Sequence, residues 1–353
     1  MTTIDFRSDT VTQPTDEMRM AMRNAELGDD VLDGDPTVMR LEQTVADLLG
    51  KDAAVFVPSG TMANLIAVSL HCRAGEQFFC ESTSHVAVFE QCGHAQIWGV
   101  AAKTFDGDRG IIAPEQFENQ LRPESNIHFA PTRAVFLENT HNYGGGRIYP
   151  IEWLTQISQW ARANQLTLHL DGARLMNAVV ATGIPACDWA RHFDTVSLCF
   201  SKGLGAPVGS VLAGPEPMIA LARRRRKALG GGMRQAGVLA AAAIFALDHH
   251  VDRLREDHDN AKLFAEKIAH FDAFTPTFDT VDTNILFFDV TPEYGTAQSV
   301  CRDAAKLGVL MHPSSQTTVR VVTHLGITQN DVLTAMDRLA AIARFPPASK
   351  TLG

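Results

Sequence analysis

Two short apolar runs, each ending next to a charged residue, constrain the fold more than any other feature of the chain. The run 166–170 is followed by Asp171, and the run 195–200 is followed at once by a turn that contains Lys202. Apolar runs of this length that end at glycine-containing turns are typical of buried strands. In open α/β sheets, ligands bind at the carboxyl ends of the strands. We therefore predict that Asp171 and Lys202 face the same ligand site.

This pair of side chains suits one particular cofactor. A lysine in an apolar pocket loses solvation, which favours its neutral and nucleophilic amine. Pyridoxal phosphate is held by such a lysine on its aldehyde carbon and by an aspartate on its pyridine nitrogen. A surface lysine in a turn is the alternative, and for a lysine taken alone it is the commoner case. The ordered pair favours a pyridoxal-phosphate site with Lys202 as the Schiff-base lysine.

The composition is that of an ordinary globular protein. The chain has 353 residues, 45% of them hydrophobic, which is enough for one large α/β domain and a smaller one. Its net charge of −9 argues against a dedicated nucleic-acid binder, and the basic run 223–227 most simply covers a solvated or interface helix face. The longest apolar stretch, 236–247, is too short to span a membrane. We expect neither nucleic acid nor membrane as a partner.

The first residues and the cysteines both favour a cytoplasmic protein. Asp5, Arg7 and Asp9 stand where a signal peptide needs an apolar core. The six cysteines include no C-x-x-C pair and lie mostly within apolar runs. We therefore predict buried reduced thiols, with neither a metal site nor a disulfide framework.

Strand-like and helical patterns alternate through the first part of the chain. Strands are predicted at 53–57, 77–80, 99–105, 134–138, 166–170, 195–200 and 210–213, and helices at 37–49, 61–72, 84–92, 114–121 and 151–163. A short helix is also expected from Asp16, and the pattern from 215 to 270 is helical, broken at the glycines 230–232. Such alternation predicts a mostly parallel sheet with helices on both faces.

The remainder of the chain reads as a small α+β domain. Strands are predicted at 284–290, 308–312 and 318–323, and helices at 296–307 and 328–344. We expect a large domain over residues 1–250, including an irregular N-terminal arm, a small domain over 251–345, and a tail over 346–353.

A turn of small residues after the first predicted strand could bind an anion. Pro58, Ser59, Gly60 and Thr61 open the predicted helix 61–72. Helix N-termini leave backbone N–H groups free for a phosphate, so this turn is a candidate phosphate cup. A plain strand-to-helix connection is the alternative for such a turn considered alone.

Eight segments, in order along the chain, resemble the L-threonine aldolases, which are pyridoxal-phosphate enzymes of the aspartate-aminotransferase fold (fold type I). They are IDFRSDTVTQPT (4–15), FVPSGTMAN (56–64), HVAVFE (85–90), LENTHN (137–142), LHLDGAR (168–174), SKGLGAPVGS (201–210), GGGMRQ (230–235) and VRVVTH (319–324). The resemblance covers residues 4 to about 345. It implies an α/β large domain with a mostly parallel, seven-stranded sheet and a small C-terminal α+β domain.

The resemblance also implies roles around the cofactor. Lys202 is expected to form the Schiff base and Asp171 to pair with the pyridine nitrogen. Ser59, Gly60 and Thr61 are expected to hold the phosphate. His85 is expected to stack on the cofactor ring and to act in catalysis.

Further implied roles concern the substrate and the assembly. Ser8, Arg174 and Arg320 are expected to bind the substrate carboxylate, and Arg174 also counts among the cofactor-binding residues. His128 is the second histidine expected near the substrate hydroxyl. In the expected homotetramer, a dimer of dimers with active sites shared between subunits, Lys227 and Arg234 reach the phosphate site of a neighbouring subunit.

The implied reaction is retro-aldol cleavage of L-threonine, L-allo-threonine and related β-hydroxy-α-amino acids to glycine and an aldehyde. Its chemistry needs a base for the β-hydroxyl proton, for which an imidazole is the usual candidate. The alternative within the fold is a β-eliminating lyase or aminotransferase-like enzyme acting on a β-hydroxy amino acid such as phenylserine or 3-hydroxyaspartate. From other classes, a non-catalytic binding protein and a nucleic-acid binder with a basic helix remain open. The loops 143–147 and 314–318 differ in sequence from those of many relatives, so the sequence does not define which substrate side chain is preferred.

Overall fold

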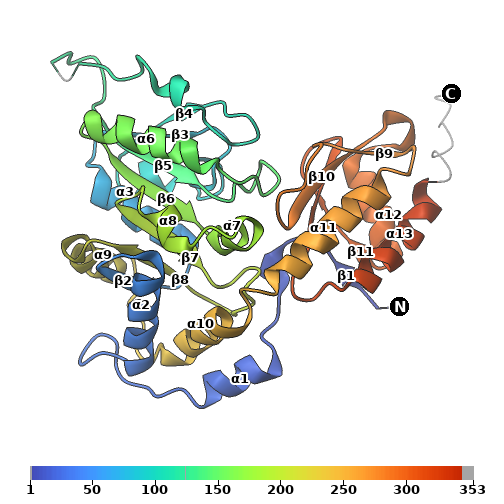
Figure 1. The fold of residues 1–353 in the computed structure, drawn as a ribbon, viewed down its shortest axis with the longest axis horizontal. Coiled ribbons are helices and arrows are strands. Elements are labelled where there is room, and N and C mark those ends of the chain that lie inside the picture. The colour runs from blue at the N-terminus through green and yellow to red at the C-terminus, as the bar shows by residue number, and fades with distance from the viewer. Residues whose placement is uncertain (1, 124, 344–353) are drawn as a thin grey trace.

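The computed structural model describes residues 2–123 and 125–343, so the predicted tail, 346–353, lies outside the described residues. The chain forms a larger and a smaller lobe side by side (Figure 1). Helix α11 (Leu254–Ile268) and the N-terminal arm run between the two lobes. Among the described residues, no helix is both long enough and apolar enough to cross a membrane.

The large lobe is built on a seven-stranded sheet with the strand order β2-β8-β7-β6-β5-β3-β4. Its strands are β2 (Ala53–Val57), β3 (Gln77–Glu81), β4 (Ala101–Phe105), β5 (Thr132–Glu138), β6 (Thr167–Gly172), β7 (Thr195–Cys199) and β8 (Ser210–Gly214). Only β8 runs antiparallel to its neighbours. All seven strands are those predicted from the sequence, which confirms the α/β class.

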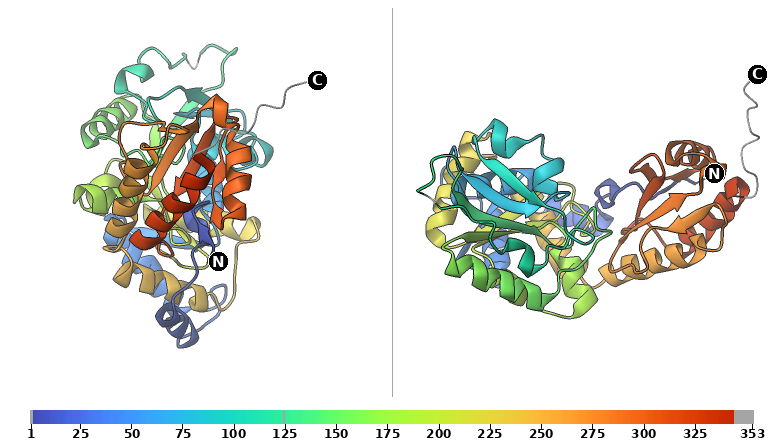
Figure 2. Two further views of the ribbon diagram at one scale, coloured as in Figure 1. Left: turned by 90° about the vertical axis from the view of Figure 1, so that its right-hand side faces the viewer. Right: turned by 90° about the horizontal axis from the view of Figure 1, so that it is seen from above.

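Helices cover both faces of this sheet, as Figure 2 shows from above. On one face lie α3 (Gly60–His71) and α9 (Glu216–Ala228), and on the other lie α2 (Pro36–Leu49), α6 (Ile151–Ala163), α7 (Leu175–Thr182), α8 (Ala186–Ala190) and α10 (Gly237–His249). In β2, Val55 and Val57 pack with α3 while Ala54 and Phe56 pack on the opposite face. Burial on both faces explains why the strands read as continuous apolar runs.

The same alternation fixes the direction of the polar side chains in β6. Leu168 and Leu170 belong to the core on the α2 face of the sheet. Because successive side chains point to opposite faces, His169 and Asp171 point toward α3. The polar side chains of β6 therefore lie on the face of the sheet that α3 covers.

The small lobe combines a four-stranded antiparallel sheet with helices. The strand order is β12-β13-β10-β9, with β9 (Phe274–Pro276), β10 (Ile285–Val290), β12 (His312–Pro313) and β13 (Thr318–Val322). Its helices are α11, α12 (Ala297–Lys306) and α13 (Gln329–Ala343). The 3-10 turn η3 (Pro292–Tyr294) precedes α12.

The start of the chain packs in this small lobe, which differs from the expected domain division. Strand β1 (Ile4–Asp5) pairs in parallel with β11 (Val309–Leu310), and Phe6 is fully buried in the small-lobe core. The arm then continues through η1 (Asp9–Val11) to α1 (Asp16–Arg23), which packs on α10. The N-terminal arm therefore connects the two lobes instead of belonging to the large one alone.

Several predicted elements differ from the structure. Of the helix predicted at 84–92 only α4 (His85–Val88) forms, because Gln91 and Cys92 have φ of 54° and 55°, outside the helical region. The unpredicted α5 (Gly93–Gln96) follows them. The helix predicted at 114–121 is only the 3-10 turn η2 (Pro114–Phe117). Helices α7 and α8 were not predicted, and the strand predicted at 308–312 is divided into β11 and β12.

Candidate active site

Lys202 and Asp171 lie at the same edge of the large sheet. Strands β6 and β7 are parallel neighbours, with Asp171 opposite Ser197. Lys202 follows β7 in a turn closed by the Gly205 N–H, which donates to the Lys202 carbonyl at 2.9 Å. Thr12 Oγ1 donates to the same carbonyl at 3.1 Å, so the N-terminal arm fastens the turn. The structure thus brings together the amine and the carboxylate predicted from the sequence.

Asp171 is a buried carboxylate held ionised by its neighbours. Asn64 Nδ2 donates to Oδ2 at 2.7 Å, and the Ala173 N–H donates to Oδ1 at 3.0 Å. Burial alone would raise the pKa of Asp171, but the charges of His85 and Lys202 and these hydrogen bonds hold that pKa below its usual value. Asp171 is therefore a fixed negative charge at the sheet edge.

His85 lies next to Asp171 with one ring nitrogen already committed. It begins α4, and its Nδ1 is 2.7 Å from Glu90 Oε1. Burial opposes the charged imidazole, but the Glu90 bond and the Asp171 charge outweigh it and raise the pKa of His85. Since Nδ1 bonds Glu90, Nε2 is the ring nitrogen that exchanges a proton with a ligand, as acid in the charged imidazole and as base in the neutral one. The backbone N–H of His85 donates to Glu138 Oε2 at 2.6 Å and fixes the start of the helix.

Arg174 and Arg320 both lie near this edge, but their donors are used differently. Arg174 forms a bidentate ion pair with the buried Asp9, with both N···O distances at 2.7 Å. Arg320 donates through Nη2 to Asn142 Oδ1 at 2.6 Å, while its buried Nε has no hydrogen-bond partner among the described residues. Burial, with the charge of Arg174, lowers the pKa of Arg320 to about 10. Of the two guanidinium groups, Arg320 is the one whose buried Nε donor, unpaired among the described residues, a bound anion could satisfy.

Ser8 reaches the same region through the N-terminal arm. Its Oγ accepts from the Thr10 N–H at 3.2 Å and so caps η1. The preceding Arg7 carbonyl accepts from Arg320 Nη1 at 3.4 Å, and the following Asp9 holds Arg174. The three residues expected to bind the substrate carboxylate are therefore gathered by one short segment.

The Asp9–Arg174 pair predicts a specific loss of stability. Asp9→Asn leaves the Arg174 charge buried without a partner, which typically costs about 3–5 kcal/mol. Burial would raise the pKa of Asp9, but Arg174 holds it far below its usual range. The stabilisation is therefore present above the unfolded carboxyl pKa of about 3.9 and is lost as the pH falls from there toward the folded value. Urea unfolding at pH 7 and at pH 3 measures the difference from wild type, which should shrink at the lower pH.

A matched control separates the pair from a general effect of neutralising an aspartate. Asp303 is exposed on α12 and bonds only Arg302 and Lys306 in the described structure. Asp303→Asn should leave the urea midpoint almost unchanged. An equal shift for both variants at pH 7 would contradict a stabilising role of the Asp9–Arg174 pair.

The candidate phosphate cup also lies at this edge. Ser59 caps α3, its Oγ accepting from the Met62 N–H at 3.1 Å. The ends of β2 and β7 are level, since Val57 and Cys199 are both opposite Ser210. A side chain at Gly60 would place its Cβ 2.7 Å from Cys199 Sγ, so only glycine allows α3 to start this close to the Lys202 turn. Ser59, Gly60 and Thr61 therefore lie at the start of α3, close to the turn that contains Lys202.

Three other predicted residues are not brought to this edge within the single chain. Arg234 pairs with Asp29 of the N-terminal arm at 3.2 Å, and Lys227 lines a basic pocket with Arg223, Arg224 and Arg226. His128 is exposed in the segment 125–131, at the outer end of the large lobe (Figure 1). Over the described residues, none of the three forms a hydrogen bond or ion pair with Lys202, Asp171 or Ser59.

Sequence reasoning missed the residues that support the site. Asn64, Glu90 and Asp9 are all buried and all bond a predicted site residue. Each stood within a segment that carried the family resemblance, but no role was assigned to it. A usable signal existed for Asn64, since an amide on an otherwise apolar stretch of helix is buried only when it is hydrogen-bonded.

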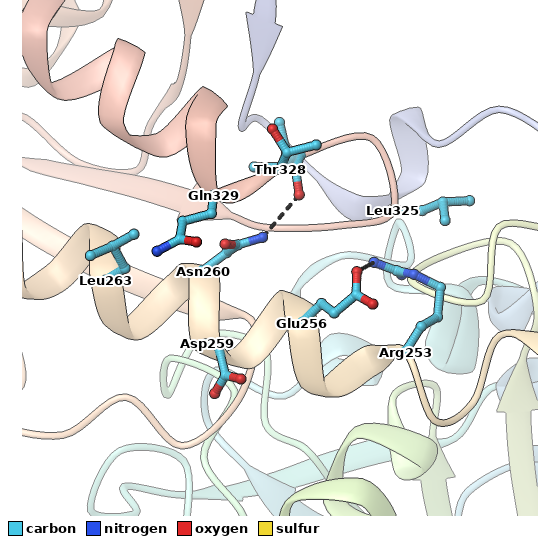
Figure 3. Close-up of a pocket in the computed structure, with 9 residues that line it drawn as sticks. Arg253, Glu256, Asp259, Asn260, Leu263, Leu325, Thr328 and Gln329 are labelled. Carbon is cyan, nitrogen blue, oxygen red and sulfur yellow. Dashed lines mark hydrogen bonds and ion pairs between the residues drawn. The ribbon is translucent and has the colours of Figure 1, made fainter.

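A separate cavity of about 520 Å³ lies at the junction of the lobes, beside α11 (Figure 3). Its lining is mostly polar and includes Arg253, Glu256, Asn260 and Gln329. Asn260 Nδ2 donates to the Ile327 carbonyl at 2.9 Å across it. None of the predicted site residues lines this cavity, so the chemistry of the Lys202 edge does not extend to it.

Comparison with known proteins agrees with this site. Residues 5–291 match the family described as beta-eliminating lyase. A probable low-specificity L-threonine aldolase of Arabidopsis thaliana is 43% identical, with 94% of each chain covered, and the low specificity L-threonine aldolase of Escherichia coli K12 is 42% identical over 93% of this chain and 96% of that one. The solved threonine aldolase of Leishmania major has the same fold, with a TM-score of 0.80, 20% identity, and 96% and 99% of the two chains covered.

The fold likeness confirms the predicted architecture, and the sequence identities extend over nearly the whole chain. The family match, over residues 5–291, includes the arm with Ser8 and Asp9 and the turn with Lys202. This chain therefore belongs to the low-specificity L-threonine aldolases of the beta-eliminating lyase family.

Proposed function

We propose that the protein cleaves L-threonine, L-allo-threonine and related β-hydroxy-α-amino acids to glycine and an aldehyde, with pyridoxal phosphate bound at Lys202. The observation that carries the proposal is the placement of Lys202 and Asp171 at one sheet edge, beside the start of α3. Family membership supports the same reaction, since the relatives are named low-specificity L-threonine aldolases.

Pyridoxal phosphate fits the residues present. Asp171 offers an ionised carboxylate for the pyridine nitrogen, Lys202 an amine for the aldehyde carbon, and the first turn of α3 its N–H groups for the phosphate. When bound, the cofactor supplies an acceptor for the electron pair left at Cα as the Cα–Cβ bond breaks. The protein has to hold the substrate in the right orientation and move its protons.

Orientation of the substrate falls to the arginines and the N-terminal arm. The buried Arg320 Nε lacks a partner among the described residues, and a substrate carboxylate would provide one. Arg174, held by Asp9, adds positive charge and its remaining N–H groups, and Ser8 adds a hydroxyl. A carboxylate gripped in a fixed geometry sets which bond at Cα stands perpendicular to the cofactor ring.

In this proposal, His85 removes the proton of the β-hydroxyl group. Its Nε2 accepts the proton, while the Nδ1–H bond to Glu90 keeps the ring from turning. We assign His128 to the same reaction as a group that discriminates between the two β-epimers, supplied from another subunit. Its exposed neighbours Ile127 and Phe129 are apolar, which suits a subunit contact.

The assembly and location belong to the same proposal. In a homotetramer, the basic pocket with Lys227, together with Arg234, would reach the phosphate site of a neighbouring subunit. The pocket carries four cationic side chains and Asp30; Arg226 pairs with Asp30 and Arg223 with Glu42, and the remaining positive charge of Arg224 and Lys227 suits a phosphate. The six cysteines are all unpaired, as a reducing cytoplasm allows, but Cys92 and Cys187 are exposed, so the prediction of buried thiols is wrong for these two.

The substrate side chain lies toward an aromatic wall in this proposal. Tyr143 packs against Phe89 and Phe287, with ring centroids 5.4 and 6.1 Å away, and Phe89 in turn lies 5.7 Å from His85. Ser314 Oγ donates to the Tyr143 hydroxyl at 3.3 Å, so the two loops that depart from many relatives meet here. An apolar wall beside His85 supports a broad tolerance for the β-substituent.

The phosphate cup leads to a prediction in which a second substitution should reverse the effect of the first. Gly60→Ala pushes the first turn of α3 away from Cys199 Sγ, and overpacking of this kind typically costs about 1–3 kcal/mol. Cofactor affinity should therefore fall about tenfold or more, since ~1.4 kcal/mol is a factor of ten. Equilibrium dialysis of pyridoxal phosphate measures it. Cys199→Ala in the same chain makes room and should restore most of the affinity; no restoration would place the defect elsewhere.

The experiment that tests the function is a product analysis. With the protein and pyridoxal phosphate, threonine should give glycine and acetaldehyde in equal amounts. The name of the matching family favours a second candidate, β-elimination, which would give ammonia and a keto acid from the same substrate. Ammonia and keto acid without glycine would overturn the aldolase proposal in favour of this alternative.

A further inference from the structure

One amide on α3 touches both carboxylates of the site. Asn64 Nδ2 donates to Asp171 Oδ2 at 2.7 Å and to Glu90 Oε1 at 2.8 Å. Glu90 Oε1 in turn holds His85 Nδ1 at 2.7 Å. Asn64 is 1% exposed, and both carboxylates are buried beside it. The amide therefore joins the partner of the pyridine nitrogen to the partner of the catalytic imidazole.

The orientation of this amide is fixed by its other contacts. The Asn64 carbonyl oxygen Oδ1 lies 3.1 Å from His169 Nε2 and 3.3 Å from Ser197 Oγ, both of which donate to it. With the amide turned over, its oxygen would face Asp171 Oδ2, an ionised carboxylate that has no proton to offer. Both N–H groups of Asn64 must therefore point to Asp171 and Glu90.

A series of neutral, hydrogen-bonded side chains on the far side of Asn64 supports this orientation of its amide. Burial lowers the pKa of His169 to about 3 and that of His71 to about 4, so each ring carries a single N–H at neutral pH. Since His169 Nε2 donates to Asn64, its Nδ1 accepts from Thr195 Oγ1 at 2.8 Å. Thr195 Oγ1 then accepts from His71 Nε2 at 2.7 Å. Every donor points toward the site, an arrangement in which successive hydrogen bonds strengthen one another.

Polar residues in this interior follow the strand alternation. Thr195 and Ser197 in β7 and His169 and Asp171 in β6 alternate with core leucines and valine, and all four are buried. Polar groups with only a structural role would need hydrogen-bond partners only among themselves. This series of hydrogen bonds instead ends on the two carboxylates that face the proposed cofactor and base.

We propose that Asn64 is a positioning residue that couples Asp171 to the Glu90–His85 pair, so that one amide sets both the ionised partner of the pyridine nitrogen and the orientation of the base. The inference rests on the proposed function, because it assigns Asn64 to the cofactor and proton handling of that site. It adds Asn64, Glu90 and His169 to the residues that determine activity.

The test uses Asn64→Leu and Asn64→Asp in the full-length protein. Asn64→Leu keeps the branching at Cγ, with a larger side chain, but removes both donors, and Asn64→Asp keeps the shape but sets a third carboxyl group against Asp171 and Glu90. Loss of a hydrogen bond to a buried charged group corresponds to about a 10- to 100-fold effect. We expect a loss of this size in pyridoxal-phosphate affinity for both variants, and a shift in the pH dependence of the visible absorbance of the bound cofactor.

The pH response separates positioning from a structural role. At acidic pH the carboxyl group introduced by Asn64→Asp gains a proton and becomes a donor, so its cofactor affinity should recover toward that of wild type. Asn64→Leu should show no such recovery. Ser69→Ala, on the same helix but bonded only to the Ile66 carbonyl, is the matched control and should leave affinity and absorbance unchanged.

The outcomes are separate from those of the proposed function, because cofactor binding and absorbance need no turnover. Failure of wild type to cleave threonine would reject the function, while the binding results would still test Asn64. Wild-type affinity and absorbance profile in a folded Asn64→Leu protein would overturn the coupling. If that variant does not fold, Asn64→Asp without acid recovery would overturn it equally. Glu90→Gln removes the carboxylate that both His85 Nδ1 and Asn64 Nδ2 contact but leaves Asp171 in place, so it should change the pH–rate profile more than the cofactor affinity.

Discussion

Lys202→Ala is expected to abolish measurable cleavage of threonine. Loss of a positioned acid–base group alone typically costs ~10²–10⁴-fold in rate, and this change also removes the covalent hold on the cofactor. The expected loss is therefore at or beyond the upper end of that range. Glycine release from threonine, with pyridoxal phosphate in excess, measures it.

Two controls make the Lys202 result specific. Lys202→Arg keeps the positive charge that acts on Asp171, but a guanidinium stays protonated and cannot attack an aldehyde, so this variant should be as inactive as Lys202→Ala. Lys306→Ala removes an exposed lysine on α12 and should have wild-type activity. An active Lys202→Arg protein would show that the reaction needs a charge at this position and no covalent attachment.

Asp171→Asn is expected to give the second largest loss. The opposite charge of a buried carboxylate typically shifts a neighbouring pKa by 1–3 units, and one unit is about 1.4 kcal/mol. Without that charge the pyridine nitrogen loses its proton more easily, so the electron pair left at Cα is less stabilised. We expect kcat to fall about 10- to 1,000-fold, since each ~1.4 kcal/mol in the barrier is tenfold in rate.

The Asp171 variant has to be measured with the cofactor loaded. Asn is nearly the same size, but its amide also meets Asn64 Nδ2, so cofactor affinity should be titrated for each protein before kcat is compared. Asp303→Asn, on α12 far from Lys202, is a suitable control for neutralising an aspartate. A fully loaded Asp171→Asn protein with wild-type kcat would contradict the role of Asp171.

The large sheet could be predicted from the sequence because its strands are buried on both faces and end at glycine-containing turns. The position of Asp171 and Lys202 followed from the same pattern, since both close a strand at one sheet edge. The short β1–β11 pairing could not be predicted, because strands of two residues carry no periodic signal. The helix at 84–92 was overestimated, because positive φ at Gln91 and Cys92 is set by the tertiary structure.

The contacts that support the site could not be predicted from the sequence for a different reason. Asn64, Glu90 and His169 are joined by hydrogen bonds across 26 and 105 positions of the chain, and such contacts exist only once the sheet and α3 have packed. The pairing of Arg174 with Asp9 spans 165 positions and likewise depends on the N-terminal arm crossing between the lobes. In the described part of the single chain, His128, Lys227 and Arg234 form no hydrogen bond or ion pair with Lys202, Asp171 or Ser59, and the roles proposed for them depend on a second subunit.

The most direct test of the central claim is to locate the covalent attachment of the cofactor. Purified protein incubated with pyridoxal phosphate should be yellow, and borohydride should remove the visible band by reducing the bond to the lysine. Mass spectrometry of the digested protein should then find the reduced cofactor on Lys202. Cofactor on a different lysine, or no stable attachment despite binding, would contradict the assignment of Lys202 and with it the proposed active site.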